Sequence, residues 1–445
     1  MNKVFSKAIA AALAGVMTIS LAACGSSSSD TSSSASSSAS SSSVASGEKV
    51  KLNLWHIQNT EPAPTIIKDS MARFMKDNPN YEVTTTLIQN DAFKEKLKIA
   101  MNSKTMPDIF PHWTGGNMNT YADDEIIADL TSYMNENNYK DRFMDAAIGQ
   151  VTYKDKLWAV PVENTSVAMV FYNKDMFAKY NLEVPKTISE FEKVCDTLKS
   201  KGVTPLSLAN KTQWTGSMWY CYLVDRFGGS SAFNDAANRT GSFENEAFTK
   251  AGETLQKWVK ADYFNKGFNG LDEDSGQSRT LLYTDKAAMT VMGSWFLSTV
   301  QGENAEFYKK VGSFNFPAAD GGKGDPNAVL GTVGDNFYSV AASCKDVAGA
   351  FKAATYLIDD TAAAKRIEAG RIPPLKSTKV TDPLLQVVLD AVVKAPSVQL
   401  WYDQYLPAEL ADVHKSTSQA LFGLEKTPEQ VNKEMEAKAA EVLKK

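Results

Sequence analysis

Residues 50–55, Val-Lys-Leu-Asn-Leu-Trp, begin the segment that decides the fold. Apolar and polar side chains alternate there with a period of two, which predicts a half-buried β-strand. A helical pattern follows, and the strand pattern returns at residues 81–88. A second helical pattern over 92–101 leads to a short strand at 107–110. Strand, helix, strand, helix, strand is the order typical of a parallel α/β sheet.

Two polar loops follow the first and third of these strands, at residues 56–61 and 112–117. Each loop contains or adjoins a tryptophan, Trp55 or Trp113. Because ligands of open α/β sheets bind beyond the carboxyl ends of the strands, we expect both loops to line a binding site.

The rest of the chain also has patterns that predict helices and strands. Thr187 and Glu190 predict a capping box at the start of a helix, and residues 244–264 predict another helix with an apolar stripe. After residue 342 we expect helices except at 370–375, with an amphipathic helix at the end. The further strands that the sequence predicts lie at 157–161, 167–172, 205–209, 286–295 and 330–342, the last interrupted by glycines.

Composition limits the class of protein. A net charge of −5 without a basic stripe argues against a nucleic-acid partner. Cys195, Cys221 and Cys344 are scattered and odd in number, which predicts buried thiols rather than a disulfide framework. No apolar run of about 18 or more residues follows the N-terminal region, so we expect the body not to span a membrane.

The N-terminal region has the pattern of a secretion signal. Lys3 and Lys7 precede an apolar run over residues 8–21, and the sequence Leu-Ala-Ala-Cys ends at Cys24. This sequence resembles a bacterial lipoprotein box, which implies a mature chain that begins at a lipidated Cys24. Residues 25–47 are nearly all serine, with little to bury, and predict a disordered tether.

Catalytic and metal motifs do not appear in the sequence. It contains no GxSxG, HExxH, Walker or GxGxxG pattern, and His56, His112 and His414 lie too far apart for a local metal motif. Residues 272–276, Asp-Glu-Asp-Ser-Gly, lack the glycine and glutamate spacing of an EF-hand, so we expect a solvated acidic loop. We therefore expect no metal, no cofactor and no enzyme activity, although the many carboxylates leave a glycosidase pair open.

The tryptophans carry the clearest functional signal. Trp158 and Trp258 fit core positions, whereas the other six fall at or near predicted strand ends or loops, beside amide, carboxylate and glycine residues. A sugar ring has an apolar C–H face and a rim of hydroxyls, so its site needs flat aromatic faces with polar groups around them. The six are Trp55, Trp113, Trp214, Trp219, Trp295 and Trp401.

The body of the chain resembles the extracellular solute-binding proteins of sugar importers, the maltose-binding-like group. The order and spacing of the matching pieces cover residues 48–445. These pieces are residues 52–55 (Leu-Asn-Leu-Trp), 107–110 (Pro-Asp-Ile-Phe), 171–175 (Phe-Tyr-Asn-Lys-Asp), 287–289 (Ala-Ala-Met) with 293–295 (Gly-Ser-Trp), and 427–430 (Thr-Pro-Glu-Gln).

The resemblance implies an α/β fold of two lobes, a type II periplasmic-binding-protein-like clamp with three hinge crossings that closes on its ligand. We expect a signal peptide at residues 1–23 and the lipidated tether at 24–47. The first lobe is expected at 48–163 plus 336–371, the second at 167–330 plus 376–445, and the hinges near 163–167, 330–336 and 371–375.

The resemblance also implies pocket positions. In relatives, pocket aromatics occupy the places of Trp113, Trp214, Trp219, Trp295 and Trp401, and the first loop supplies polar contacts at the places of His56, Gln58 and Asn59. Residues 114–117, Thr-Gly-Gly-Asn, lack the Asp-Arg pair of some relatives, which argues against a strict maltodextrin preference. The complete set of expected ligand-binding residues adds Trp55, Asn117, Glu163, Asn164, Gln213, Asp335, Asn336 and Arg371.

The resulting hypothesis is a monomeric receptor, lipid-anchored through Cys24 at the outer face of a bacterial cell membrane. It would capture an oligosaccharide and deliver it to an ABC permease. Within the receptor class, a polyol, a sugar phosphate or a peptide remains an alternative cargo. A surface glycoside hydrolase or an adhesin is the alternative from another class.

Overall fold

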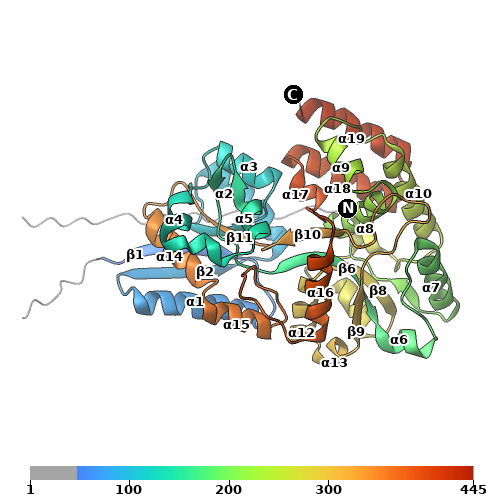
Figure 1. The fold of residues 1–445 in the computed structure, drawn as a ribbon, viewed down its shortest axis with the longest axis horizontal. Helices are drawn as coiled ribbons and strands as arrows, with labels where there is room; N and C mark the ends of the chain where they lie inside the picture. The colour runs from blue at the N-terminus through green and yellow to red at the C-terminus, as the bar shows by residue number, and fades with distance from the viewer. Residues whose placement is uncertain (1–47, 444–445) are drawn as a thin grey trace, which may run out of the picture. The chain divides into compact units, whose positions relative to one another are not determined.

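The computed structural model describes residues 48–443, which fold around two β-sheets (Figure 1). The expected signal peptide, Cys24 and the serine-rich tether lie outside the described residues. Within those residues, no helix combines the length and the apolar character needed to cross a bilayer.

The first sheet has four strands in the order β11-β3-β1-β2. β1 pairs in parallel with both β2 and β3, as the sequence predicts, and Leu54 lies opposite Ile109 and Thr85. The edge strand β11 runs antiparallel to β3, so the sheet is mixed. The strands are β1 (Val50–His56), β2 (Tyr81–Leu87), β3 (Ile109–His112) and β11 (Phe337–Val340).

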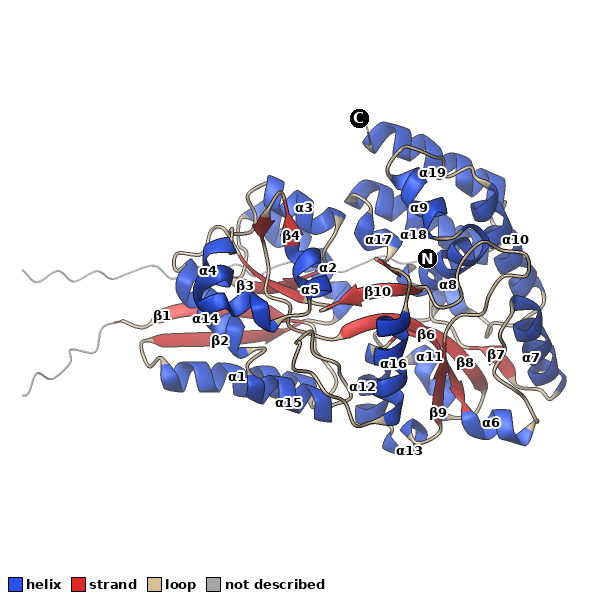
Figure 2. Ribbon diagram, viewed as in Figure 1, coloured by secondary structure: helices blue, strands red, loops and turns tan. Residues whose placement is uncertain are grey.

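Helices cover both faces of this sheet (Figure 2). Leu52 and Leu54 pack in one apolar cluster with Phe74 of α1, while Trp55 packs with Phe93 of α2 in another. Figure 1 shows α14 and α15, drawn in orange, beside the blue α1, so distant segments of the chain build one lobe. The elements of this lobe are α1 (Ala63–Asp77), α2 (Asn90–Ser103), α3 (Gly116–Asp123), α4 (Thr131–Asn135), η1 (Glu136–Arg142), α5 (Asp145–Val151), β4 (Thr152–Tyr153), β5 (Lys156–Leu157), α14 (Val347–Tyr356) and α15 (Asp360–Glu368).

The second sheet has six strands, with β12-β10-β6-β8-β7 in order and β9 paired with β6. β6 is antiparallel to each of its partners, β8, β9 and β10. Every residue of β8 is buried, as expected for a central strand. The strands are β6 (Thr165–Asn173), β7 (Thr204–Leu206), β8 (Ala287–Gly293), β9 (Val311–Phe314), β10 (Val329–Val333) and β12 (Val398–Gln399).

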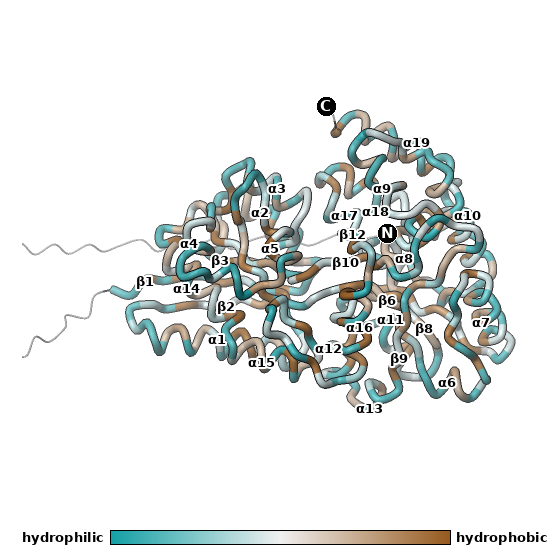
Figure 3. The backbone as a smooth tube through the Cα atoms, viewed as in Figure 1, coloured by the Kyte–Doolittle hydropathy of each residue, from teal (hydrophilic) through white to brown (hydrophobic). Residues whose placement is uncertain are grey.

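The larger apolar core surrounds this second sheet and contains Phe171, Trp219 and Trp258. Figure 3 shows hydrophobic stretches of the chain along the central strands, with hydrophilic turns outside them. The helices of this lobe are α6 (Lys174–Lys179), α7 (Ile188–Ser200), α8 (Trp214–Gly228), α9 (Ser230–Ala237), α10 (Glu246–Lys260), η2 (Phe268–Gly270), α11 (Gln277–Tyr283), α12 (Trp295–Glu303), α13 (Ala305–Tyr308), α16 (Pro383–Lys394), α17 (Tyr402–Tyr405), α18 (Ala408–Phe422) and α19 (Pro428–Val442).

The chain passes between the two sheets three times. It leaves the first lobe before β6, returns between β10 and β11, and enters the second lobe again between α15 and α16. The strand expected at 330–342 is therefore two strands in different sheets. Gly334 (φ 98°) and Asn336 (φ 56°) lie between them in the left-handed region, where a continuous strand cannot run.

Three local predictions differ from the structure. Helices are expected after residue 342 except at 370–375, but residues 398–399 form β12, which pairs in parallel with β10. The strand expected at 157–161 is limited to the short β5 and one bridge between Val160 and Tyr338. Thr187 does cap α7, accepting a hydrogen bond from the amide of Glu190 at 3.2 Å. Glu190, however, accepts from the amide of Lys186 at 2.7 Å instead of Thr187, so the capping box is incomplete. The complete capping box belongs to Thr427 and Gln430 at the start of α19.

Candidate functional site: a cleft between the two lobes

A cavity of about 480 Å³ lies between the lobes, a volume within the range of ligand pockets. The loops after β1 and β3 and the helices α2 and α3 line it from the first lobe. Helices α8, α12 and α18 and the segment before α18 line it from the second. The expected binding residues that line it are Gln58, Asn59, Trp113, Asn117, Glu163, Asn164, Trp214, Trp295, Asp335, Asn336, Arg371 and Trp401.

Three tryptophans of the second lobe form a continuous aromatic wall. The ring centroids of Trp214 and Trp295 are 6.1 Å apart, and those of Trp295 and Trp401 are 6.0 Å apart. Trp113 lies on the other lobe, and the ammonium of Lys94 is 5.1 Å from its ring centroid and 5.8 Å from that of Trp214. Aromatic faces from both lobes therefore reach one cleft.

Helix α8 explains why Trp214 lines the cleft and Trp219 does not. Trp214, Ser217, Met218 and Cys221 line the cavity, with the i, i+3, i+4, i+7 spacing of one helix face. Trp219 is five residues beyond Trp214, about 140° around the helix. Its side chain is 0% exposed and packs against Trp258 and other core aromatic rings. The expectation that Trp219 contacts ligand is therefore wrong.

Three other expected site residues do not line the cleft. Trp55 points to the face of the first sheet under α2, where its ring meets Phe93 edge-on at 6.4 Å. His56 alternates to the opposite face and is 4% exposed. Gln213 precedes α8 with φ 74° and donates to Gln419 Oε1 at 3.1 Å, which directs it toward α18.

A buried hydrogen-bond network connects the three crossings at the base of the cleft. Glu163 on the first crossing accepts from Arg371 at 2.5 Å and from Arg366 at 3.0 Å. Arg371 also donates to Gln58 at 2.7 Å, and Gln58 donates to Asn336 on the second crossing at 3.1 Å. The polar side chains that face the cavity are thus held in fixed positions relative to the hinges.

Asn164 adds backbone connections to the same network. Its side-chain oxygen accepts from the amide of Ile372 on the third crossing at 2.6 Å. Its backbone carbonyl accepts from the amides of Gly334 at 3.2 Å and Asp335 at 2.8 Å on the second crossing. One asparagine therefore joins all three crossings.

Burial and nearby charges shift the pKa values of these groups in opposite directions. Burial alone would raise the pKa of Glu163, but the guanidinium groups of Arg366 and Arg371 outweigh it and lower that pKa to about 2. Burial raises the pKa of Asp335, whose hydrogen bonds with Asn336 only partly offset it. Glu163 is therefore a carboxylate at neutral pH and holds both arginines in place.

The lobes also contact each other directly beside the cavity. The amide of Asp91, at the start of α2, donates to Asp274 Oδ2 at 3.0 Å across the cleft. A Cβ atom added at Gly116 would lie 2.3 Å from the carbonyl oxygen of Leu406 in the other lobe, so only glycine permits this approach. Both contacts join elements far apart in the chain.

The acidic loop at 272–276 was wrongly expected to be only a solvated surface loop. Glu273 is 5% exposed and forms an ion pair with Arg279 at 2.5 Å. Glu273, Asp274 and Arg279 all line the cleft. Lys94 and Asp403 also line the cleft, which the sequence did not predict. Nothing in the sequence around either residue indicates which lobe its side chain faces.

The described residues contain no group of three or more His, Cys, Asp or Glu side chains placed to hold a metal ion. The three cysteines of the described body are buried and free, as predicted.

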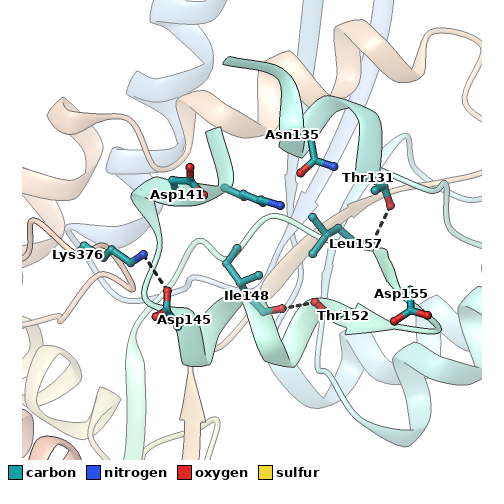
Figure 4. Close-up of a pocket in the computed structure, with 10 residues that line it drawn as sticks. Thr131, Asn135, Asp141, Asp145, Ile148, Thr152, Asp155, Leu157 and Lys376 are labelled. Atoms are coloured by element: carbon teal, nitrogen blue, oxygen red, sulfur yellow. Dashed lines mark hydrogen bonds and ion pairs between the residues drawn. The ribbon is translucent and has the colours of Figure 1, made fainter. Parts of the chain in front are cut away.

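A second cavity of about 400 Å³ is lined by first-lobe residues together with Lys376 (Figure 4). α4, α5 and the β4–β5 hairpin surround it, and Lys376 and Asp145 form an exposed ion pair of 2.8 Å at its edge. Neither a tryptophan nor any expected binding residue lines it. The cleft between the lobes is therefore the candidate site.

Two α/β lobes, three crossings and an aromatic cleft define a two-lobed, type II periplasmic ligand-binding protein. Comparison with known proteins gives the same class: residues 58–364 match the model of the bacterial extracellular solute-binding proteins. The chain belongs to this family, whose members are receptors for solutes rather than enzymes.

Individual relatives support this assignment. A solved structure from work on xylan utilization by the thermophilic bacterium Caldanaerobius polysaccharolyticus is 33% identical, with a TM-score of 0.82 over 87% of this chain and all of that chain. A chitin oligosaccharide binding protein shares the fold, with 23% identity and a TM-score of 0.82 over 89% of this chain and 99% of that one. The multiple sugar-binding protein of Streptococcus mutans is 23% identical over 78% of this chain and 76% of its own length.

Proposed function

We propose that this protein captures an oligosaccharide in the cleft between its lobes and delivers it to an ABC permease. The observation that carries the proposal is the wall of Trp214, Trp295 and Trp401, which faces Trp113 of the other lobe. Flat indole rings bind the C–H faces of sugar rings, while the amides and carboxylates of the cleft bind hydroxyl groups.

The names of the relatives suggest the first ligands to test. One similar structure comes from work on xylan utilization, and one similar sequence is named as a multiple sugar-binding protein. Xylan-derived oligosaccharides therefore head the panel, followed by galactose-containing oligosaccharides, because a Bacillus subtilis relative is named as a melibiose/raffinose/stachyose-binding protein. Isothermal titration calorimetry against these ligands, with monosaccharides, a polyol and a sugar phosphate alongside, tests the assignment. Absence of heat from every sugar would refute a carbohydrate ligand.

We propose that the lobes are residues 48–163 with 336–371, and residues 167–330 with 376–445. The three crossings act as hinges, and ligand stabilises the closed form because it contacts both lobes at once. Small-angle X-ray scattering should show a smaller radius of gyration when the ligand is added. An unchanged radius in a protein that binds the ligand would refute hinge closure.

We further propose that the protein is a monomer attached to the outer face of the cell membrane through lipid on Cys24. Residues 24–47 would act as its tether. Two or more acyl chains give stable anchoring. Changing Cys24 to Ala should move the protein from the membrane fraction to the medium without changing its ligand affinity. Retention of this variant in the membrane fraction would refute the anchor.

A further inference from the structure

The charged groups of the cleft are unequally partnered. Of the five cationic side chains that line the cleft, four form an ion pair with a carboxylate of the described residues and Lys98 does not. These pairs are Arg371 with Glu163 at 2.5 Å, Arg279 with Glu273 at 2.5 Å and with Glu303 at 2.8 Å, Lys415 with Asp412 at 3.0 Å, and Lys94 with Asp91 at 3.3 Å. The further cation, Lys98, is exposed at the rim on α2, three residues from the equally exposed Glu95.

Four carboxylates of the cleft have no such partner among the described residues: the exposed Glu95 at the rim and the less exposed Asp274, Asp335 and Asp403. Asp403 forms neither an ion pair nor a side-chain hydrogen bond there, and Asp274 accepts only the amide of Asp91 at 3.0 Å. Asp335 accepts from Ser166 Oγ at 3.3 Å and from the amide of Asn336 at 2.9 Å. Two lysines, Lys415 and Lys94, have charges near Asp403. Both already form ion pairs with other carboxylates, Lys415 with Asp412 and Lys94 with Asp91.

The surroundings of Asp274, Asp335 and Asp403 favour uncharged hydrogen-bond donors from a ligand. Burial raises the pKa values of Asp274, Asp335 and Asp403. An ionised carboxylate only accepts hydrogen bonds, and sugar hydroxyls can supply the missing donors. A ligand carboxylate brought beside these aspartates would meet charges of the same sign. The site is partly desolvated, so the repulsion would be strong.

We propose that Asp403 and Asp274 make the cleft selective for uncharged oligosaccharides and exclude acidic ones that carry uronic acid groups. Neighbouring hydroxyls of a neutral sugar donate to these carboxylates while its ring lies against the indoles of Trp214 and Trp401. This inference rests on the proposed function and adds the charge class of the ligand to it.

The test uses two matched pairs of ligands and calorimetry of the full chain. The first pair is xylotriose with a neutral arabinosyl branch and xylotriose with a glucuronosyl branch. The second pair is galactotriose and trigalacturonic acid. The neutral member should bind at least a hundredfold more tightly, because like charges in a binding site are strongly unfavourable. An acidic member that binds as tightly as its neutral counterpart would overturn the proposal and leave the receptor function intact.

Asp403→Asn and Asp274→Asn assign the effect to these residues. Each keeps the shape of the side chain and removes its charge, so the ratio between neutral and acidic affinities should fall at least tenfold in one or both variants. The matched control is Asp155→Asn, an exposed carboxylate at the edge of the cavity in Figure 4, which changes the net charge equally. A ratio unchanged in both cleft variants, or changed equally by Asp155→Asn, would refute the assignment. Absence of binding by all four ligands would count against the proposed carbohydrate function itself.

Discussion

Replacing Glu163 by Gln should destabilise the fold, because this carboxylate is buried between two guanidinium groups. Its side chain is 3% exposed, and that of Arg366 is 2% exposed. The variant leaves Arg366 and Arg371 buried without their counter-charge. Loss of one partner of a buried ion pair costs about 3–5 kcal/mol.

The pKa of Glu163 gives an independent magnitude. Its fall from the ordinary value of 4.5 to about 2 corresponds to about 3 kcal/mol, at about 1.4 kcal/mol for each pH unit. Because the folded state has the lower pKa, this stabilisation is complete above about pH 4.5 and is lost as the pH falls toward 2. The difference between wild type and Glu163→Gln should therefore be about 3 kcal/mol at pH 7 and only about 1.5 kcal/mol at pH 3.

Urea unfolding followed by tryptophan fluorescence at both pH values measures this difference. Asp145→Asn is the matched control, because it removes a carboxylate from an ion pair whose Asp145 side chain is 93% exposed. We expect no measurable change from the control. A Glu163→Gln variant as stable as the control at pH 7, or equally destabilised at both pH values, would refute the reasoning.

The remaining predictions concern the aromatic wall and closure of the cleft. Trp214→Ala and Trp295→Ala should each weaken oligosaccharide binding by about 1–3 kcal/mol in calorimetry, since each removes a stacking surface; unchanged affinity in both would place the site elsewhere. Trp219→Ala should instead lower the free energy of unfolding by about 3–5 kcal/mol, because it empties a core position, and a wild-type urea midpoint would contradict that role. Gly116→Ala should weaken binding at least tenfold and favour the open form in small-angle scattering, because its Cβ would meet the Leu406 carbonyl oxygen at 2.3 Å. Its control is Gly149→Ala, which has no atom within 4 Å of the added Cβ; equal affinities in the two variants would show that Gly116 is not a closure contact.

The local pattern of the chain was sufficient to predict much of the site. Gln58 and Trp113 lie just after strands, where period-two alternation ends, and both reach the cleft. Trp295 follows the buried strand β8 and also reaches it. The predictions of cleft residues were wrong where the direction of a side chain depended on the residues that pack against it. Trp219 and Trp214 are alike in their sequence surroundings, but Trp219 packs among core aromatic rings on one side of α8, whereas Trp214 lines the cleft on another.

The sequence by itself determined the alternation of strands and helices, the family, and a set of tryptophans suited to sugars, because these depend on short-range periodicity and residue chemistry. Only the tertiary structure decided which charges are partnered. Glu163 pairs with Arg371 across 208 residues of chain, whereas, within the described residues, Asp274 accepts only the backbone amide of Asp91, 183 residues away. The path of the chain through three crossings sets such pairings, and no local pattern of side chains encodes that path.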